Sequence, residues 1–229
     1  MTSLLAIETS SESCSVALSM DGEVREVHEH APLHHAELLL PAVNRLLAEA
    51  GISLSALDVI AFGRGPGSFT SLRIGIGVVQ GLAWAADLPV APLSSLAAVA
   101  QEAAERAGPA APQIRVAVDA RMKEVFSAEY VTARGGLVTA AGEERVGPPG
   151  AIAVGVAPPF VAAGNGFARF AELQELGRTG VACYPDLVPR AAMIARLALG
   201  WLEHNQPLPA ALAQPVYVRN KVAEKPGGG

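Results

Sequence analysis

The chain opens twice with the same local pattern, and this repetition restricts its fold more than any other feature. Within residues 4–28, a short apolar strand ends at Glu8, and a polar turn leads into two alternating segments typical of a hairpin. Within residues 114–140, an apolar strand ends at Asp119 and a second hairpin pattern follows. A Pro- and Gly-rich stretch at 108–112 separates the copies. The sequence therefore predicts two related units, each beginning with strand, acid, turn and hairpin.

Helical periodicity accounts for much of the remaining sequence. Apolar residues at three- and four-residue spacing predict helices at residues 34–50, 70–86, 94–107 and 191–203. Short apolar strands are predicted between the first three of these helices. We expect an N-terminal domain over residues 1–107, a smaller C-terminal domain over 108–220, and a flexible tail over 221–229.

Two mixed-sheet units, each with an acid at the end of its first strand, resemble the duplicated ribonuclease-H-like core of actin, the Hsp70 ATPase domain and sugar kinases (the ASKHA fold). The expected fold class is therefore α/β, with two ribonuclease-H-like domains related by duplication and the second domain reduced. In proteins of that architecture the two acids face each other across a cleft that holds nucleotide phosphates and a divalent cation. The resemblance makes Glu8 and Asp119 the corresponding pair here.

Composition narrows the cellular setting. The formal net charge is −5, and the sequence has no Lys/Arg cluster of the kind that anchors phosphate backbones, which argues against a stand-alone nucleic-acid binder. No apolar run reaches the roughly 18 uncharged residues of a membrane helix, and the N-terminus lacks the basic region of a signal peptide. Cys14 and Cys183 are far apart, without metal-ligand spacing. A cytoplasmic protein without a membrane partner is expected.

Four stretches carry a more specific resemblance. They read LLAIETSSESCSVAL at 4–18, GRGPGSFTSLRIGIGVVQGLAWA at 63–85, VDARMKEVFSAEY at 118–130 and PVYVRN at 215–220. These stretches resemble the signature segments of the TsaB family, formerly called YeaZ, and the similarity spans nearly the whole chain. The second stretch is the most specific, because a long Gly-Pro-Gly-Ser-Phe-Thr run into a glycine-bearing helix is rare by chance.

The resemblance implies a dimerisation subunit of the bacterial complex that makes N6-threonylcarbamoyladenosine at position 37 of tRNAs reading ANN codons. In that family the partner is TsaD, a catalytic paralogue of the same fold that transfers the threonylcarbamoyl group. TsaE, a P-loop ATPase, joins the pair, and TsaC makes the threonylcarbamoyl-adenylate substrate. The resemblance therefore implies that this chain supports TsaD, meets tRNA through the complex, and forms a homodimer when isolated.

One position separates the chain from the transferase. After the second helix, the TsaD family has an H-x-x-x-H pair that holds the active-site metal, and the corresponding residues here are Ser95 and Val99. A hydroxyl is a poor ligand and a valine side chain has no lone pair, so we expect that metal site not to form. We therefore expect no catalytic residue, no stoichiometric zinc or iron, and a role other than that of an enzyme.

A vestigial nucleotide cleft is the second candidate site. Its expected residues are Glu8, Thr9, Ser10, Gly65, Gly67, Asp119, Gly164 and Gly166. Each feature also has an ordinary structural reading: the acids end strands, Ser and Thr cluster in turns, and the Gly65-Pro66-Gly67 turn lacks the lysine of a P-loop. Because no basic residue is evident beside either acid, ATP or ADP is expected to bind weakly or not at all, and no cofactor is required.

The two long apolar helices are the candidate partner surface. Each is apolar on more than one face, whereas a helix covering its own sheet needs one apolar stripe. The expected interface residues are Leu39, Val43, Leu47, Ile74, Gly77, Val78 and Gly81. The alternative is that both helices are simply buried more deeply inside this chain. His34, His35 and Glu37 are close in sequence, but helical spacing points them apart, which favours a surface role over a metal site.

Rival functions come from other classes. One alternative is a weak ATPase or kinase of the actin fold, and another is the protease suggested by older labels for the wider family. A third alternative is a self-associating structural protein. The protease reading lacks any credible metal or nucleophile constellation in the sequence.

Overall fold

The computed structural model describes residues 2–108, 113–133, 135–153 and 158–219. Its two mixed sheets have the same topology, as the repeated sequence pattern predicts. The first sheet has the order β3-β2-β1-β4-β5, and the second has the order β11-β10-β6-β7-β8, with β9 paired to β7. In each sheet the first strand carries an antiparallel hairpin on one side and parallel strands on the other. The fold is α/β, with two ribonuclease-H-like units related by duplication.

The strand bounds follow the apolar segments of the sequence. The first sheet contains β1 (Leu4–Glu8), β2 (Ser13–Met20), β3 (Glu23–His30), β4 (Val59–Gly63) and β5 (Val90–Leu93). The second contains β6 (Gln113–Asp119), β7 (Val125–Thr132), β8 (Val138–Ala140), β9 (Arg145–Gly147), β10 (Val161–Ala163) and β11 (Ala182–Tyr184). The register of the hairpins pairs Leu4 with Ser19 and Gln113 with Val131.

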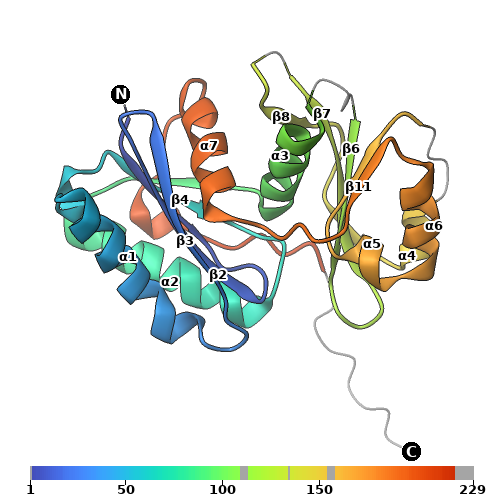
Figure 1. The fold of residues 1–229 in the computed structure, drawn as a ribbon. Coiled ribbons are helices and arrows are strands. Elements are labelled where there is room, and N and C mark those ends of the chain that lie inside the picture. The colour runs from blue at the N-terminus through green and yellow to red at the C-terminus, as the bar shows by residue number, and fades with distance from the viewer. Residues whose placement is uncertain (1, 109–112, 134, 154–157, 220–229) are drawn as a thin grey trace, which may run out of the picture.

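Helices cover both faces of the two sheets (Figure 1). The helices are α1 (His35–Ala50), α2 (Phe69–Ala86), α3 (Ser95–Ala107), α4 (Pro149–Ala153), α5 (Gly166–Arg169), α6 (Ala171–Thr179) and α7 (Ala191–Leu202). Short 3-10 turns occur at Leu54–Ala56 and Ala210–Leu212. Helices α1 and α2 lie on the outer face of the first sheet, α4 to α6 lie on the outer face of the second, and α3 and α7 lie between the sheets (Figure 1).

Strand β1 is buried along its whole length because both faces of the first sheet are covered. Leu5 and Ile7 pack into the apolar cluster under α1 and α2, whereas Leu4 and Ala6 pack into the cluster on the opposite face. This explains why the strand reads as a continuous apolar run rather than as an alternating one. A third cluster, around Phe160, lies under α5 and α6.

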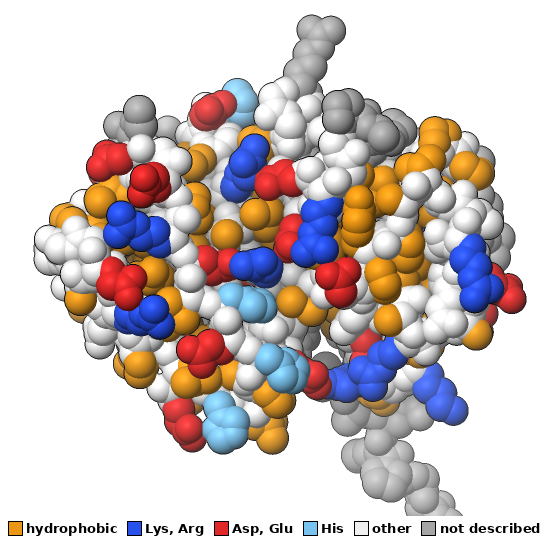
Figure 2. Space-filling view, viewed as in Figure 1, with side chains coloured by type: hydrophobic (Ala, Val, Ile, Leu, Met, Phe, Trp, Pro, Cys, Tyr) orange, Lys and Arg blue, Asp and Glu red, His pale blue; other side chains and the backbone are white. Residues whose placement is uncertain are grey.

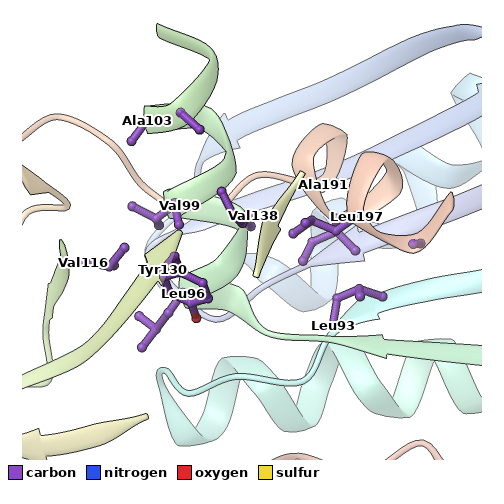
Figure 3. Packing of buried hydrophobic residues seen from close by; sticks show 14 of the residues in the cluster. Leu93, Leu96, Val99, Ala103, Val116, Tyr130, Val138, Ala191 and Leu197 are labelled. Carbon is purple, nitrogen blue, oxygen red and sulfur yellow. The ribbon is translucent and has the colours of Figure 1, made fainter. Parts of the chain in front are cut away.

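Each of the two helices between the sheets packs on the sheet of the other half of the chain. Helix α3, which precedes the linker, packs on β6, β7, β8 and β10 of the second sheet. Helix α7, which follows the second sheet, packs on all five strands of the first sheet. Figure 3 shows the interior that they share, with Leu96 and Val99 from α3 near Ala191 and Leu197 from α7.

The exchange changes the domain division drawn from sequence. That division assigns residues 94–107 to the N-terminal domain and residues 191–203 to the C-terminal domain, but each helix packs on the other sheet. The final segment also returns to the first sheet, where Leu208 bridges Val90 and the Val216 amide donates to the Arg64 carbonyl at 2.8 Å. Local periodicity marks each helix but says nothing about which sheet the helix covers. The expected tail, 221–229, lies outside the described residues.

Polar groups of the first sheet fix the start of α7. The Ala191 amide donates to Ser15 Oγ at 2.9 Å, and the Ala192 amide donates to Glu26 Oε1 at 2.9 Å. These bonds satisfy two of the amides that a helix start leaves without intrahelical partners. Arg190 Nε donates to Glu26 Oε2 at 3.1 Å, and the Glu26 side chain is only 9% exposed. The docking of α7 therefore depends on β2 and β3.

Candidate functional site

A cleft of about 660 Å³ lies between the two domains at the ends of β1 and β6. Much of its lining comes from residues 10–13, 66–71, 118–122 and 216–219. These segments are the β1–β2 turn, the start of α2, the β6–β7 turn and the C-terminal segment. The cleft therefore occupies the position that the fold class predicts for a nucleotide.

The predicted pair of facing acids does not form. Glu8 is fully buried and is absent from the lining of the cleft. Its carboxylate accepts hydrogen bonds from the Ser10 amide at 2.5 Å and from Ser95 Oγ at 2.7 Å. Burial raises the pKa of Glu8 above its ordinary value of 4.5, and these hydrogen bonds only partly offset that effect. Glu8 is an interior acid rather than a ligand in the cleft.

Asp119 does line the cleft, but its carboxylate is already engaged. Its Oδ2 lies 2.8 Å from Arg169 NH1 and 3.6 Å from Arg121 NH1, and its Oδ1 accepts from the Arg121 amide at 3.0 Å. With Glu8 turned inward and Asp119 neutralised by two guanidinium groups, the two acids do not fit a divalent cation.

The remaining predicted cleft residues divide into lining and support. Ser10 and Gly67 line the cleft. Thr9 instead donates to the Ser71 carbonyl at 2.9 Å, and its side chain is closely packed against Gly75. Gly65, Gly164 and Gly166 are buried and absent from the lining, which contains the neighbouring Pro66 and Asn165 instead. Gly164 has φ +103°, and a Cβ there would lie 2.4 Å from the Ala117 carbonyl oxygen.

The expectation that the cleft lacks cations is wrong. Arg121, Arg169 and Arg219 all line it, although they are far apart in sequence. Each is paired with a carboxylate: Arg121 with Glu12, Arg169 with Asp119, and Arg219 with Glu124. Three arginines on separate segments leave no cluster for a sequence pattern to reveal. Elsewhere on the surface, acidic and basic side chains are interspersed over the face shown in Figure 2.

The predicted partner surface is exposed on α2, but the residues predicted for it on α1 are buried. Leu39, Val43 and Leu47 are 0%, 1% and 8% exposed and belong to the core between α1, α2 and the sheet. The predicted apolar row on α1 is therefore the interior face of that helix, and Val43→Glu would disrupt the fold rather than an interface. Leu40 is the large apolar residue of α1 that is exposed.

Helix α2 presents a narrow, open stripe of small residues. Gly77 and Gly81 are exposed, and a Cβ added at either position would meet nothing within 4 Å. Ile74 and Val78 flank them and are half-buried. The third glycine differs, because a Cβ at Gly75 would lie 2.2 Å from Thr9 Oγ1. Gly75 thus permits close packing within the chain. Gly77 and Gly81 instead leave the exposed face of α2 without side chains that would hold another molecule away from the helix backbone.

Trp84 extends the same stripe and was missed by sequence reasoning, which favours tryptophan in a core. Its side chain is 80% exposed on α2, one turn beyond Gly81. The helical spacing of 77, 81 and 84 was the available signal. By length and hydropathy, α2 is the one described helix that meets the criterion for a membrane span, but it contains Arg73 and buries one side on its own sheet.

The two positions expected to distinguish this chain from the transferase lie in its interior. Ser95 and Val99 are both 0% exposed on α3, with the Ser95 hydroxyl bonded to Glu8. The expected surface position is wrong for His35, which is buried with Nε2 3.0 Å from the Ser11 carbonyl oxygen, whereas His34 is exposed and contacts Glu37. Over the described ranges, no three His, Cys, Asp or Glu side chains gather as a metal ion would require.

Two ribonuclease-H-like sheets with exchanged helices around a shared cleft define the class of actin, Hsp70 and sugar kinases. Within that class, residues 27–179 match the family model described as TsaD: tRNA N6-adenosine threonylcarbamoyltransferase. The tRNA threonylcarbamoyladenosine biosynthesis protein TsaB of Haemophilus influenzae is 37% identical over 97% of this chain and 95% of its own. The Escherichia coli TsaB is 36% identical over 97% and 96%.

A solved structure agrees with these sequence relatives. YeaZ from Pseudomonas aeruginosa superimposes with a TM-score of 0.87 and 43% identity, covering 95% of this chain and 100% of that one. The chain belongs to the TsaB family.

Proposed function

We propose that this chain acts in the synthesis of N6-threonylcarbamoyladenosine at position 37 of tRNAs reading ANN codons, as the non-catalytic subunit that binds and supports a TsaD-like paralogue. A TsaE-like ATPase joins the pair, and tRNA meets the assembly rather than this chain alone. The chain requires no cofactor and holds no stoichiometric zinc or iron. The names of its TsaB relatives and the match to the TsaD model support this proposal.

The observation that carries the binding role is the open stripe on α2. Gly77 and Gly81 leave free space above the helix, and Trp84 stands exposed beside them. Small residues let a second helix approach closely, and an exposed tryptophan is the residue type most enriched at the energetic centre of interfaces. A helix of the paralogue packed along this stripe would cover all three residues. The same uncovered stripe explains why the isolated chain is expected to form a homodimer.

The non-catalytic role is supported by what surrounds Ser95 and Val99. Both side chains are fully buried, and the Ser95 hydroxyl donates to an interior acid. Neither residue offers the nitrogen ligand that an H-x-x-x-H metal site uses. The transfer chemistry therefore belongs to the paralogue in this proposal.

The test is co-purification with the TsaD-like paralogue, followed by a transfer assay on tRNA. Gly77→Arg is expected to abolish both, because it fills the open space and places a charge in the interface. Trp84→Ala should weaken binding about tenfold. Gly142→Arg is a matched control, since Gly142 also has nothing within 4 Å of its Cβ position but lies in the other domain. Normal partner binding by a folded Gly77→Arg chain would refute the proposal.

A further inference from the structure

The mouth of the interdomain cleft carries an unusual concentration of exposed apolar side chains. Half of the large hydrophobic residues that are exposed in the described parts of the chain line this one cleft. They are Leu33, Phe69, Met122, Val216 and Tyr217. We call this group, together with Arg73, which contacts both Phe69 and Tyr217, the cleft mouth. Exposed apolar residues that gather in one place mark a binding surface more reliably than scattered ones.

Two of these exposed side chains belong to residues whose backbone adopts the unfavourable left-handed conformation. Leu33 has φ +71° and is 94% exposed, and Met122 has φ +53° and is 73% exposed. The left-handed region disfavours residues with a Cβ, and bulky side chains are found there least often. Neither side chain gains burial in this chain that would compensate for the strain. Local strain of this kind is concentrated at ligand clamps and binding sites.

Arg73 supplies a cation that is already oriented. Its guanidinium carbon lies 4.0 Å from the centroid of the Phe69 ring, and its Nε donates to Tyr217 Oη at 3.0 Å. The Phe69 and Tyr217 ring centroids are 5.4 Å apart. Among the described residues, Arg73 makes no ion pair. Its NH1 and NH2 groups are therefore positioned for a bidentate bond to a carboxylate, with little entropy left to lose.

The three arginines that line the cleft argue for a protein ligand rather than a nucleic acid. Arg121, Arg169 and Arg219 are each paired with an acid of this chain. A phosphate backbone crossing the cleft would therefore meet arginines whose charge is already balanced, together with the Glu12 and Asp119 carboxylates that also line the cleft. It would also meet the apolar tips of Leu33 and Met122, which offer nothing to a polyanion. One free guanidinium among apolar side chains suits a single carboxylate flanked by apolar groups.

We propose that the cleft mouth binds an extended segment of a partner protein in which an acidic residue lies beside a large apolar residue. The acidic side chain bonds to Arg73, and the apolar side chain packs among Leu33, Phe69 and Met122. Aromatic residues, Met and Arg are the types enriched in the buried centres of protein interfaces. This surface begins one helical turn before the Gly77–Gly81 stripe, because Arg73 lies four residues before Gly77 on α2. It takes a different ligand, and the Trp84→Ala variant below separates the two surfaces.

The test is a random-peptide display selection on the purified full-length chain, with affinities of selected peptides measured by fluorescence anisotropy. Selected peptides are expected to share a carboxylate next to a leucine or an aromatic residue. Arg73→Gln should weaken their binding about tenfold or more, whereas Trp84→Ala, on the stripe, should leave it unchanged. No enriched peptide, or peptides that bind the Arg73→Gln chain equally well, would overturn the proposal.

Two further variants separate binding from folding. Leu33→Asn and Met122→Asn replace strained, bulky residues with one that tolerates the left-handed conformation. Each variant should melt at the same temperature as the native chain or higher, and each should lose peptide affinity. If either variant instead melts clearly lower, that side chain serves stability and the proposal fails for it. A short oligouridylate serves as the nucleic-acid probe. If the oligouridylate bound the native chain more tightly than the selected peptides did, and did not bind the Arg73→Gln chain, the proposed ligand class would be wrong.

Discussion

The Ser95 hydroxyl donates a 2.7 Å hydrogen bond to the Glu8 carboxylate, joining residues 87 positions apart in the chain. Gly63 makes room for the contact, because a Cβ there would lie 1.9 Å from Glu8 Oε2 and 2.9 Å from Ser95 Oγ. The three residues come from β1, β4 and α3. Ser95, the residue expected to stand where the transferase family has a metal-binding histidine, thus satisfies a buried acid in this chain.

Glu8→Gln should alter how stability depends on pH. Burial raises the folded-state pKa of Glu8 above 4.5, so the folded chain holds this proton more tightly than the unfolded chain. The resulting stabilisation is complete below pH 4.5 and is lost as pH rises through the folded-state pKa. Urea unfolding of both chains between pH 5 and 8 should therefore show the native chain losing stability relative to Glu8→Gln as pH rises. A relative gain would show that the ionised carboxylate is the favoured form.

Alanine substitutions at the three glycines of α2 should change stability in different directions: two should stabilise the chain and one should destabilise it. Gly77→Ala and Gly81→Ala meet open space and should each stabilise the isolated chain by about 0.5–1 kcal/mol through helix propensity. Gly75→Ala forces a Cβ to within 2.2 Å of Thr9 Oγ1 and should destabilise it by about 1–3 kcal/mol. Denaturant unfolding of dilute monomer measures all three. A stabilising Gly75→Ala would mean that β1 and α2 are less closely packed than described.

Glu26→Ala should loosen α7. The substitution removes the acceptor for the Ala192 amide and leaves Arg190 without its nearest carboxylate. We expect a loss of about 1–2 kcal/mol, the usual cost of losing a helix cap. Hydrogen exchange should show faster exchange in the first turn of α7 and along the strands that it covers. Unchanged exchange there would contradict the capping role, and Glu23→Ala on the same strand is an exposed control.

ATP should bind the isolated chain no better than roughly the high micromolar range, but the reason differs from the one that the sequence offers. Cations are present in the cleft, yet Arg121, Arg169 and Arg219 are already paired with carboxylates. A triphosphate must compete with those pairs, and the two acids do not fit the magnesium ion that usually accompanies it. Isothermal calorimetry with ATP and magnesium provides the measurement. A low-micromolar dissociation constant would contradict this expectation.

Much of the fold was readable from sequence because its signals are local. The apolar runs ending at Glu8 and Asp119, and the Pro/Gly linker between them, marked two copies of one unit before any contact was known. The exchange of α3 and α7 was not readable in this way. Each helix has an apolar stripe that would fit either sheet, so periodicity places the helix without assigning its partner.

The candidate site was less predictable for a related reason. Apolar spacing on α1 was equally consistent with an outer row and an inner row, and Leu39, Val43 and Leu47 turned out to be inner. The arginines of the cleft are single residues on three separate segments, and only the tertiary fold brings them together. Leu33 gave no signal at all, because a left-handed leucine is indistinguishable from an ordinary one in a sequence.

The return of α7 to the first sheet has a consequence for synthesis. A nascent chain that has just left the ribosome with β1, β2 and β4 complete still lacks the helix that covers one of their faces. Leu4, Ala6 and Val59 then stay open to water until residue 202 has emerged. The domain that is translated first is thus finished last, and throughout translation of the second half its bare apolar face is a target for chaperones and for aggregation.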